Sequence, residues 1–376
     1  MTRQRRLRTR WTGLALGALC LSGCANLGYY WQSTRGHLQM MNAARPVSEI
    51  LSDTATPERL KARLALSQRI RSFATDTLKL PDNPSYRRYA DLQRNAVVWN
   101  VVAAPALSLT LNTWCFPVAG CVGYRGYFAE ADAQQEATAL RAQGLEAAVY
   151  GVPAYSTLGW LNWAGGDPLL STFIHYPDGE LARLVFHELA HQVVYASGDT
   201  MFNESFATAV ERLGGDRWLD EQAPPATRQA YEAFNTRRQQ FRALTAATRR
   251  TLAAIYASKP APAGVNTAGL ATQLIAKELA MQQFRQDYAT LKTSWGGFAG
   301  YDGWVARANN ASFGAQAAYD ELVPGFIALF EDEGRDWPRF YAAVKALAAL
   351  PQAERHAALQ PTHSLTESPP NGRHPH

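Results

Sequence analysis

The chain is poor in cysteine and has no excess of charge of either sign once its first residues are set aside. Beyond residue 24 it also lacks an apolar run of the length that a membrane-spanning helix needs, and no internal repeat is visible. With 376 residues, of which 47% are hydrophobic, the chain can build a large core. We therefore expect a single folded domain over residues 24–360.

The first 24 residues have the pattern of a lipoprotein signal. Five arginines between residues 3 and 10 precede an apolar stretch over residues 11–21, which is too short to span a membrane. Leu21-Ser22-Gly23-Cys24 resembles a lipobox, so we expect removal of residues 1–23 and attachment of a lipid to Cys24. An ordinary cleaved signal is the alternative. Ala25 in place of an aspartate favours the outer membrane, facing the periplasm.

Removal of this segment changes the charge balance. Five of the 37 Lys and Arg residues lie in it, which leaves 32 against 32 Asp and Glu. Nucleic-acid-binding proteins need an excess of positive charge to neutralise phosphates. We therefore expect no nucleic-acid partner.

Two of the four cysteines remain in the mature chain beside the lipidated Cys24. Cys115 and Cys121 flank the turn-like sequence Phe-Pro-Val-Ala-Gly, in a compartment that oxidises thiols. The expected result is a disulfide that closes this loop. A second metal site is the alternative, and a lone cysteine pair without nearby histidines gives it little support.

The most informative stretch is an HExxH sequence over residues 187–191. His187 and His191 are four residues apart, so on a helix they lie on one face, with Glu188 beside them. Apolar residues surround the three, which favours a buried helix with a functional polar group over a solvated or core histidine pair. Pro177-Asp178 and Ser197-Gly198 are typical helix ends, and we expect the helix to span residues 179–197.

A catalytic zinc ion has three protein ligands and one open position. The metzincin pattern is excluded, because it would need glycine at Val194 and histidine at Ser197. A second helix is expected from about residue 200 to Gly214-Gly215, and it offers Glu204 and Glu211. We predict Glu204 as the third ligand because it lies near the turn back to the first helix; Glu211 is interpreted as a surface carboxylate or one behind a ligand.

These two segments resemble the glutamate zincins, in which a later helix carries Asn-Glu-x-x-Ala with the glutamate as third ligand. More closely, the chain resembles a bacterial family of putative aminopeptidases. The resembling segments are residues 35–41, 113–128, 155–160, 186–192, 202–211 and 309–311. Only 12 residues separate His191 from Glu204, a shorter connection than in thermolysin-like enzymes. The resemblance implies aminopeptidase activity on peptide substrates, whereas the HExxH sequence by itself is equally compatible with an endopeptidase.

The remaining patterns predict an α+β fold that is predominantly helical, with zincin-like active-site helices beside a small mixed sheet and additional long helices. Strands are expected over residues 96–102, 123–128, 146–152 and 169–175. Helices are expected over residues 29–44, 57–78, 130–143, 226–257, 270–292, 319–334 and 336–350. A linker at 259–269 and a disordered tail at 361–376 complete the chain.

The predicted chemistry is peptide hydrolysis with one Zn²⁺. His187, His191 and Glu204 would bind the ion, which acidifies a water molecule, and Glu188 would act as the general base. Tyr319 is our first candidate for stabilising the oxyanion; Tyr301 and His175 are further candidates. Asn203 would orient its neighbours. The alternative is a non-catalytic envelope lipoprotein that keeps a structural zinc and binds a protein partner, for which Glu188 would be unnecessary.

Overall fold

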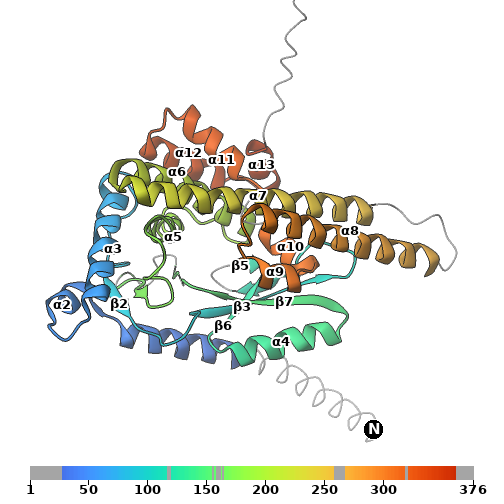
Figure 1. The fold of residues 1–376 in the computed structure, drawn as a ribbon, viewed down its shortest axis with the longest axis horizontal. Coiled ribbons are helices and arrows are strands. Elements are labelled where there is room, and N and C mark those ends of the chain that lie inside the picture. Colours follow the sequence, from blue (N-terminus) through green and yellow to red (C-terminus); the bar gives the residue numbers. More distant parts are fainter. Residues whose placement is uncertain are drawn as a thin grey trace, which may run out of the picture.

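The computed structural model describes residues 28–116, 120–154, 156–157, 162, 165–257, 267–317 and 321–360. The predicted signal segment with Cys24, most of the predicted linker, Tyr319 and the predicted tail lie outside these residues. Within the described part, helices dominate and the strands form small sheets (Figure 1). The predicted α+β fold, mainly helical, is confirmed.

The elements follow the chain with a helical start, a strand-rich middle and a helical end. A helix covers residues 28–43. The strands are β1 (Arg45–Pro46), β2 (Arg88–Ala90), β3 (Val98–Pro105), β4 (Trp114–Phe116), β5 (Gly120–Val122), β6 (Arg125–Tyr127), β7 (Leu145–Val152) and β8 (Leu169–Leu170). The further helices are α2 (Val47–Ser52), α3 (Glu58–Asp76), α4 (Glu130–Ala142), α5 (Asp178–Ala190), α6 (Thr200–Gln222), α7 (Pro225–Ala257), α8 (Thr267–Ser294), α9 (Asp302–Arg307), α10 (Asn310–Ala317), α11 (Val323–Asp332), α12 (Trp337–Ala348) and α13 (Gln352–Ala358).

The central sheet has the order β6-β3-β7, with both neighbours antiparallel to β3. Because side chains alternate across a strand, β3 serves two layers at once. Val101 and Ala103 pack with α4 on one face, whereas Val102 and Ala104 pack with Ala311 of α10 on the other. Figure 1 shows the same order of layers, with α4 and α10 on opposite sides of the sheet. A second sheet, β1-β2-β8, contains the parallel pair β2 and β8.

The largest hydrophobic core lies around the helix pair α5 and α6. Its buried members include Leu181, Val185 and Leu189 of α5, which are among the residues whose spacing predicted a buried helix face. Phe202 and Phe206 of α6 pack on Phe326 of α11. The core thus surrounds the HExxH helix, and the helix is held on the sides that do not carry the histidines.

Gly214 and Gly215 do not end a helix, contrary to the prediction, because α6 continues through them to Gln222. A Cβ atom on Gly214 would lie 2.6 Å from Leu78, and one on Gly215 would lie 2.5 Å from Arg183. The two glycines therefore allow neighbouring side chains to approach the backbone of α6 closely. The sequence pattern did not distinguish this packing role from a helix stop.

The helix that carries HExxH is shorter than predicted. It ends at Ala190, and His191 is its C-cap rather than an interior residue. The next amides bond back by three residues, from Gln192 to Leu189 and from Val193 to Ala190, which tightens the last turn. The prediction of a strand over residues 169–175 was also too long, since only Leu169–Leu170 pairs with β2.

The long helices α7 and α8 confirm the two helices predicted after residue 225. In Figure 1, α8 runs back along α7 and the pair extends away from the sheet. Phe241 and Leu252 of α7 are buried. In the described part of the chain no helix combines the length and the apolar character needed to cross a membrane.

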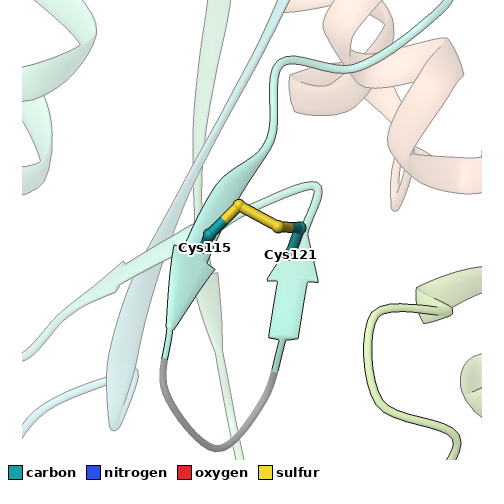
Figure 2. The surroundings of a disulfide bond; sticks show 2 residues. All are labelled: Cys115 and Cys121. Atoms are coloured by element: carbon teal, nitrogen blue, oxygen red, sulfur yellow. A yellow bond between two sulfur atoms is a disulfide. The ribbon is translucent and has the colours of Figure 1, made fainter.

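The predicted disulfide is present between Cys115 and Cys121. The two residues are directly opposite each other in the antiparallel pair β4 and β5, and Figure 2 shows the bond crossing between these strands. The bond therefore fixes the ends of a small hairpin. This hairpin leads directly into Tyr124 and β6, whose surroundings are described below.

Candidate metal centre and catalytic site

The histidines and Glu204 come together because the chain reverses between α5 and α6. The side chain of Asn203 accepts a hydrogen bond from the amide of Ala196 (2.7 Å) and donates one to its carbonyl (2.8 Å). Asp199 caps α6 by accepting from the amide of Phe202 (3.1 Å). These bonds hold the connection compact, and they give Asn203 the local orienting role that its position predicted.

Three side-chain atoms converge at this turn. Nε2 of His187 lies 3.2 Å from Nε2 of His191 and 3.3 Å from Oε2 of Glu204, and the last two atoms are 3.6 Å apart. Tetrahedral zinc with bonds of about 2.0–2.2 Å places its ligand atoms about 3.3–3.6 Å from one another. The dimensions of the cluster formed by His187, His191 and Glu204 therefore fit one zinc ion, and the cluster could bind a metal.

Glu211 fixes the orientation of His187 from behind. Its Oε2 lies 2.9 Å from Nδ1 of His187, so Nδ1 donates its proton to Glu211 and the ring turns Nε2 toward the cluster. Oε1 of Glu211 accepts a hydrogen bond from Arg183, which also donates to the hydroxyl of Tyr231. Arg183 is only 3% exposed. A buried chain of charged groups thus supports one member of the cluster.

The electrostatics of the cluster favour a positive charge at its centre. Burial raises the pKa of Glu204, but His191 and His187 outweigh it and lower the pKa to about 2. Burial lowers the pKa of His187, yet its bonds to Glu204 and Glu211 raise that pKa well above the usual value. Two ionised carboxylates therefore face these imidazoles, and a divalent cation would satisfy the same negative charge.

Glu188 lies beside the cluster and lines the same cavity as both histidines. Burial raises its pKa, while the neighbouring histidines lower it. Within the described residues Glu188 makes no hydrogen bond or ion pair, unlike Glu211 and Glu204. A half-buried carboxylate with a raised pKa and free oxygen atoms has the properties of a general base.

The cavity has a volume of about 550 Å³ and lies between the helix pair and the sheet. Its floor includes Val98 and Asn100 of β3, which point to the face of the sheet opposite α4. Tyr124 and Tyr195 also line it. A cavity of this size, with polar groups gathered at one wall, is typical of sites for small molecules or short peptides.

Two of the candidates for the oxyanion donor, Tyr301 and His175, do not lie at this cavity. Tyr301 stacks on Phe241 with ring centroids 4.0 Å apart and does not line the cavity. His175 is exposed and does not line the cavity either. Tyr319 lies outside the described residues. Hydrophobic packing explains Tyr301, and its position in the sequence gave no means of anticipating this.

A scan against known families decides the relationship of the chain. The model of the family described as "Putative aminopeptidase" matches residues 28–359. The chain belongs to this aminopeptidase family. No curated protein and no solved structure was found to match it. The family supports a peptidase, and the match covers α5, α6, the sheet and the whole cavity.

Several residues of this aminopeptidase-family site were missed by the sequence interpretation. Burial and the charge of Glu204 raise the pKa of Tyr124 well above its usual value, and the same two causes raise that of Tyr195. Both hydroxyls therefore keep their protons and can donate hydrogen bonds. Tyr195 is only four residues beyond His191, which was an available signal. Tyr124 lies in a segment that resembles the family, but nothing in its spacing pointed to the cluster.

Asp167 is a further buried acid near Glu188. Burial raises its pKa to about 6, and the charge of Glu188 adds to this effect, while hydrogen bonds with Thr157 oppose it. The carboxylate accepts from the amide of Thr157 at 3.1 and 3.0 Å. Asp167 thus holds the backbone amide of Thr157, a contact that the sequence alone did not indicate.

Proposed function

We propose that the protein is a zinc-dependent peptidase with aminopeptidase activity. The observation that carries this proposal is the triangle of His187, His191 and Glu204 atoms, whose 3.2–3.6 Å edges suit zinc, with the free carboxylate of Glu188 beside it. Two histidines and one glutamate, with an open fourth position, are a known ligand set of catalytic zinc. Membership of the aminopeptidase family supports peptides as substrates.

Each group has a defined task in this proposal. A zinc ion bound by the three ligands would supply Lewis acidity to water and to the scissile carbonyl. Glu188 removes a proton from the attacking water, whose oxygen forms a bond to the carbonyl carbon. Glu188 then gives that proton to the leaving nitrogen as the C–N bond breaks, so one water is consumed for each bond cleaved. Glu211 keeps His187 in the required tautomer.

The developing oxyanion needs a hydrogen-bond donor inside the cavity. We assign this task to Tyr124 or Tyr195 in place of the candidate Tyr319. Both tyrosines line the cavity, and the negative charge of Glu204 raises the pKa of both hydroxyls. Tyrosine-to-phenylalanine changes at each position would separate the two. Removal of the donor should lower kcat by about 10²–10³-fold, with little change in KM.

The proposed place of action is the cell envelope. A lipid on Cys24 would hold the enzyme at the outer membrane, with its folded part in the periplasm. The disulfide between Cys115 and Cys121 supports an oxidising compartment. Labelling with a radioactive fatty acid, compared between the wild type and Cys24→Ala, tests the anchor.

The decisive test of the activity compares two changes on one helix. Glu188→Gln should reduce kcat by about 10²–10⁴-fold and leave bound zinc unchanged. Glu180→Gln is the matched control, because Glu180 also lies on α5 and lines the cavity but is paired with Arg238 at 2.8 Å. Peptides with free and with acetylated N-termini then test the aminopeptidase assignment. Equal cleavage of both peptides would exclude it, and full activity of Glu188→Gln would exclude the mechanism.

A further inference from the structure

A second cavity, of about 650 Å³, adjoins the candidate catalytic cavity. Tyr124 lines both. Successive residues before Tyr124 face the two cavities in turn, because Val122 lines the first cavity and Cys121 and Gly123 line the second. The two spaces therefore meet at Tyr124, next to the hairpin that the disulfide closes.

One face of the central sheet forms a common floor. Val98 and Asn100 of β3 line the first cavity, and Val102 lines the second. These residues are two apart along one strand, so they point to the same side and follow one another at about 6.6 Å. Tyr150, which is paired with Asn100 in the sheet, also lines the second cavity. The two cavities thus share one face of the sheet as well as the side chain of Tyr124.

The charges of the second cavity are balanced except at one position. Arg249 forms an ion pair with Glu321 at 2.6 Å. Asp199 forms ion pairs with Arg355 at 2.7 Å and with His356 at 2.9 Å. Arg250 also lines the cavity, but it is exposed and makes no hydrogen bond or ion pair with the described residues. One guanidinium is therefore left to interact with a bound anion.

We propose that the second cavity binds a carboxylate of the peptide substrate through Arg250. A guanidinium presents paired donors that match the two oxygens of a carboxylate, which a peptide carries at its C-terminus or on an acidic side chain. The inference rests on the proposed function, because it places the scissile bond at the metal cluster and the carboxylate beyond Tyr124. The preferred substrates are therefore short peptides whose carboxylate reaches Arg250 when the scissile bond lies at the metal cluster.

The experiment measures both binding and cleavage with matched peptides. Alanine peptides of increasing length are prepared as free acids and as C-terminal amides. A third series is amidated and contains one internal glutamate, with glutamine in its control. Binding is measured with the zinc-loaded Glu188→Gln variant, which should cleave peptides far more slowly than the wild type, and cleavage is measured with the wild type.

The free acid of the best length should bind about tenfold more tightly than its amide, and Arg250→Met should remove this preference. Arg69→Met, at an exposed position of α3 outside both cavities, is the control and should keep it. A preference for internal glutamate over glutamine, lost in Arg250→Met, would identify an acidic side chain as the source of the carboxylate. Either preference supports the subsite.

Equal binding within every acid and amide pair and within every glutamate and glutamine pair would overturn the carboxylate subsite, as would a preference that survives in Arg250→Met. These outcomes differ from failure of the proposed function. Cleavage without a carboxylate preference would leave the peptidase and remove the subsite. A preference lost in Arg250→Met, without cleavage by the wild type, would keep the carboxylate site and remove the peptidase.

Discussion

The two cavities share one sheet face but differ in how their charged groups are used. In the first, Glu211 is bound by both His187 and Arg183, and Glu180 accepts two hydrogen bonds from Arg238. In the second, Arg250 is exposed and has no partner in the described part of the chain. Fixed pairs hold metal ligands in place, whereas an unpaired cation remains available to a ligand. Removal of the charge of Arg183 in the first cavity and of Arg250 in the second should therefore have very different effects.

The largest effect is expected at the buried pair of the first cavity. Arg183→Met leaves the carboxylate of Glu211 without its buried cation, which should lower the free energy of unfolding by about 3–5 kcal/mol. Urea denaturation measures this change. Arg183→Met combined with Glu211→Leu removes both charges and should recover part of the loss. Stability equal to that of the wild type in the single variant would contradict the assignment of this pair.

A pH-dependent effect should follow from Asp167. Its pKa is about 6 in the folded protein because of burial and nearby charge, above the usual value of 3.8. The folded state therefore retains this proton between about pH 4 and pH 6 while the unfolded chain releases it. Stability from this group is complete below about pH 4 and is lost as the pH rises to about 6, by about 3 kcal/mol in total.

The measurement compares the free energy of unfolding of the wild type and Asp167→Asn at pH 4 and pH 7. The wild type should lose about 3 kcal/mol more than the variant between the two. The difference isolates Asp167 from other acids, such as Glu188, whose pKa is also raised. An identical loss in both proteins would show that Asp167 does not carry the effect.

A smaller effect is expected when Glu211 loses its charge but keeps its shape. Glu211→Gln weakens the support of His187 Nδ1, and zinc affinity should fall by about 10–100-fold. Competition with a zinc chelator gives the affinity. Glu221→Gln on the same helix is the control, since Glu221 is an exposed partner of Arg217. Unchanged affinity in Glu211→Gln would separate Glu211 from the metal centre.

The smallest effect on stability is expected in the second cavity. Arg250→Met removes an exposed cation without a partner among the described residues, so the free energy of unfolding should stay within about 0.5 kcal/mol of the wild type. Thermal and urea unfolding check this. A loss comparable to that of Arg183→Met would remove the contrast between the cavities, because it would show Arg250 to be a structural residue.

The sequence predicted well those features that depend on local spacing. The i, i+4 histidines, the helical fold class and the disulfide all follow from positions close together in the chain, and the disulfide and fold class are confirmed. Glu204 was anticipated as the acid nearest the turn, and the structure brings its Oε2 to 3.3 Å from His187. That short reversal needed only one connecting turn, so sequence distance was a good guide to distance in space.

Features that depend on distant segments were not predictable in this way. Gly214-Gly215 looked like a helix stop, but Leu78 and Arg183 pack against these glycines from other parts of the chain. Tyr124, which follows the hairpin, lines the same cavity as the cluster, and Arg183 of α5 bonds to Glu211 of α6. A single sequence shows which residues can do chemistry, but it does not show which of them tertiary packing will bring together.

The proposed function requires that His187, His191 and Glu204 bind one zinc ion and that peptide cleavage depends on it. The most direct measurement is the zinc content of the purified wild type and of His191→Ala and Glu204→Gln, by elemental analysis, with peptide hydrolysis assayed on the same samples. We predict one zinc per chain in the wild type, loss of zinc and activity in both variants, and recovery of wild-type activity when zinc is returned after chelation. A wild type that hydrolyses peptides without metal, or variants that keep one tightly bound zinc, would contradict the account.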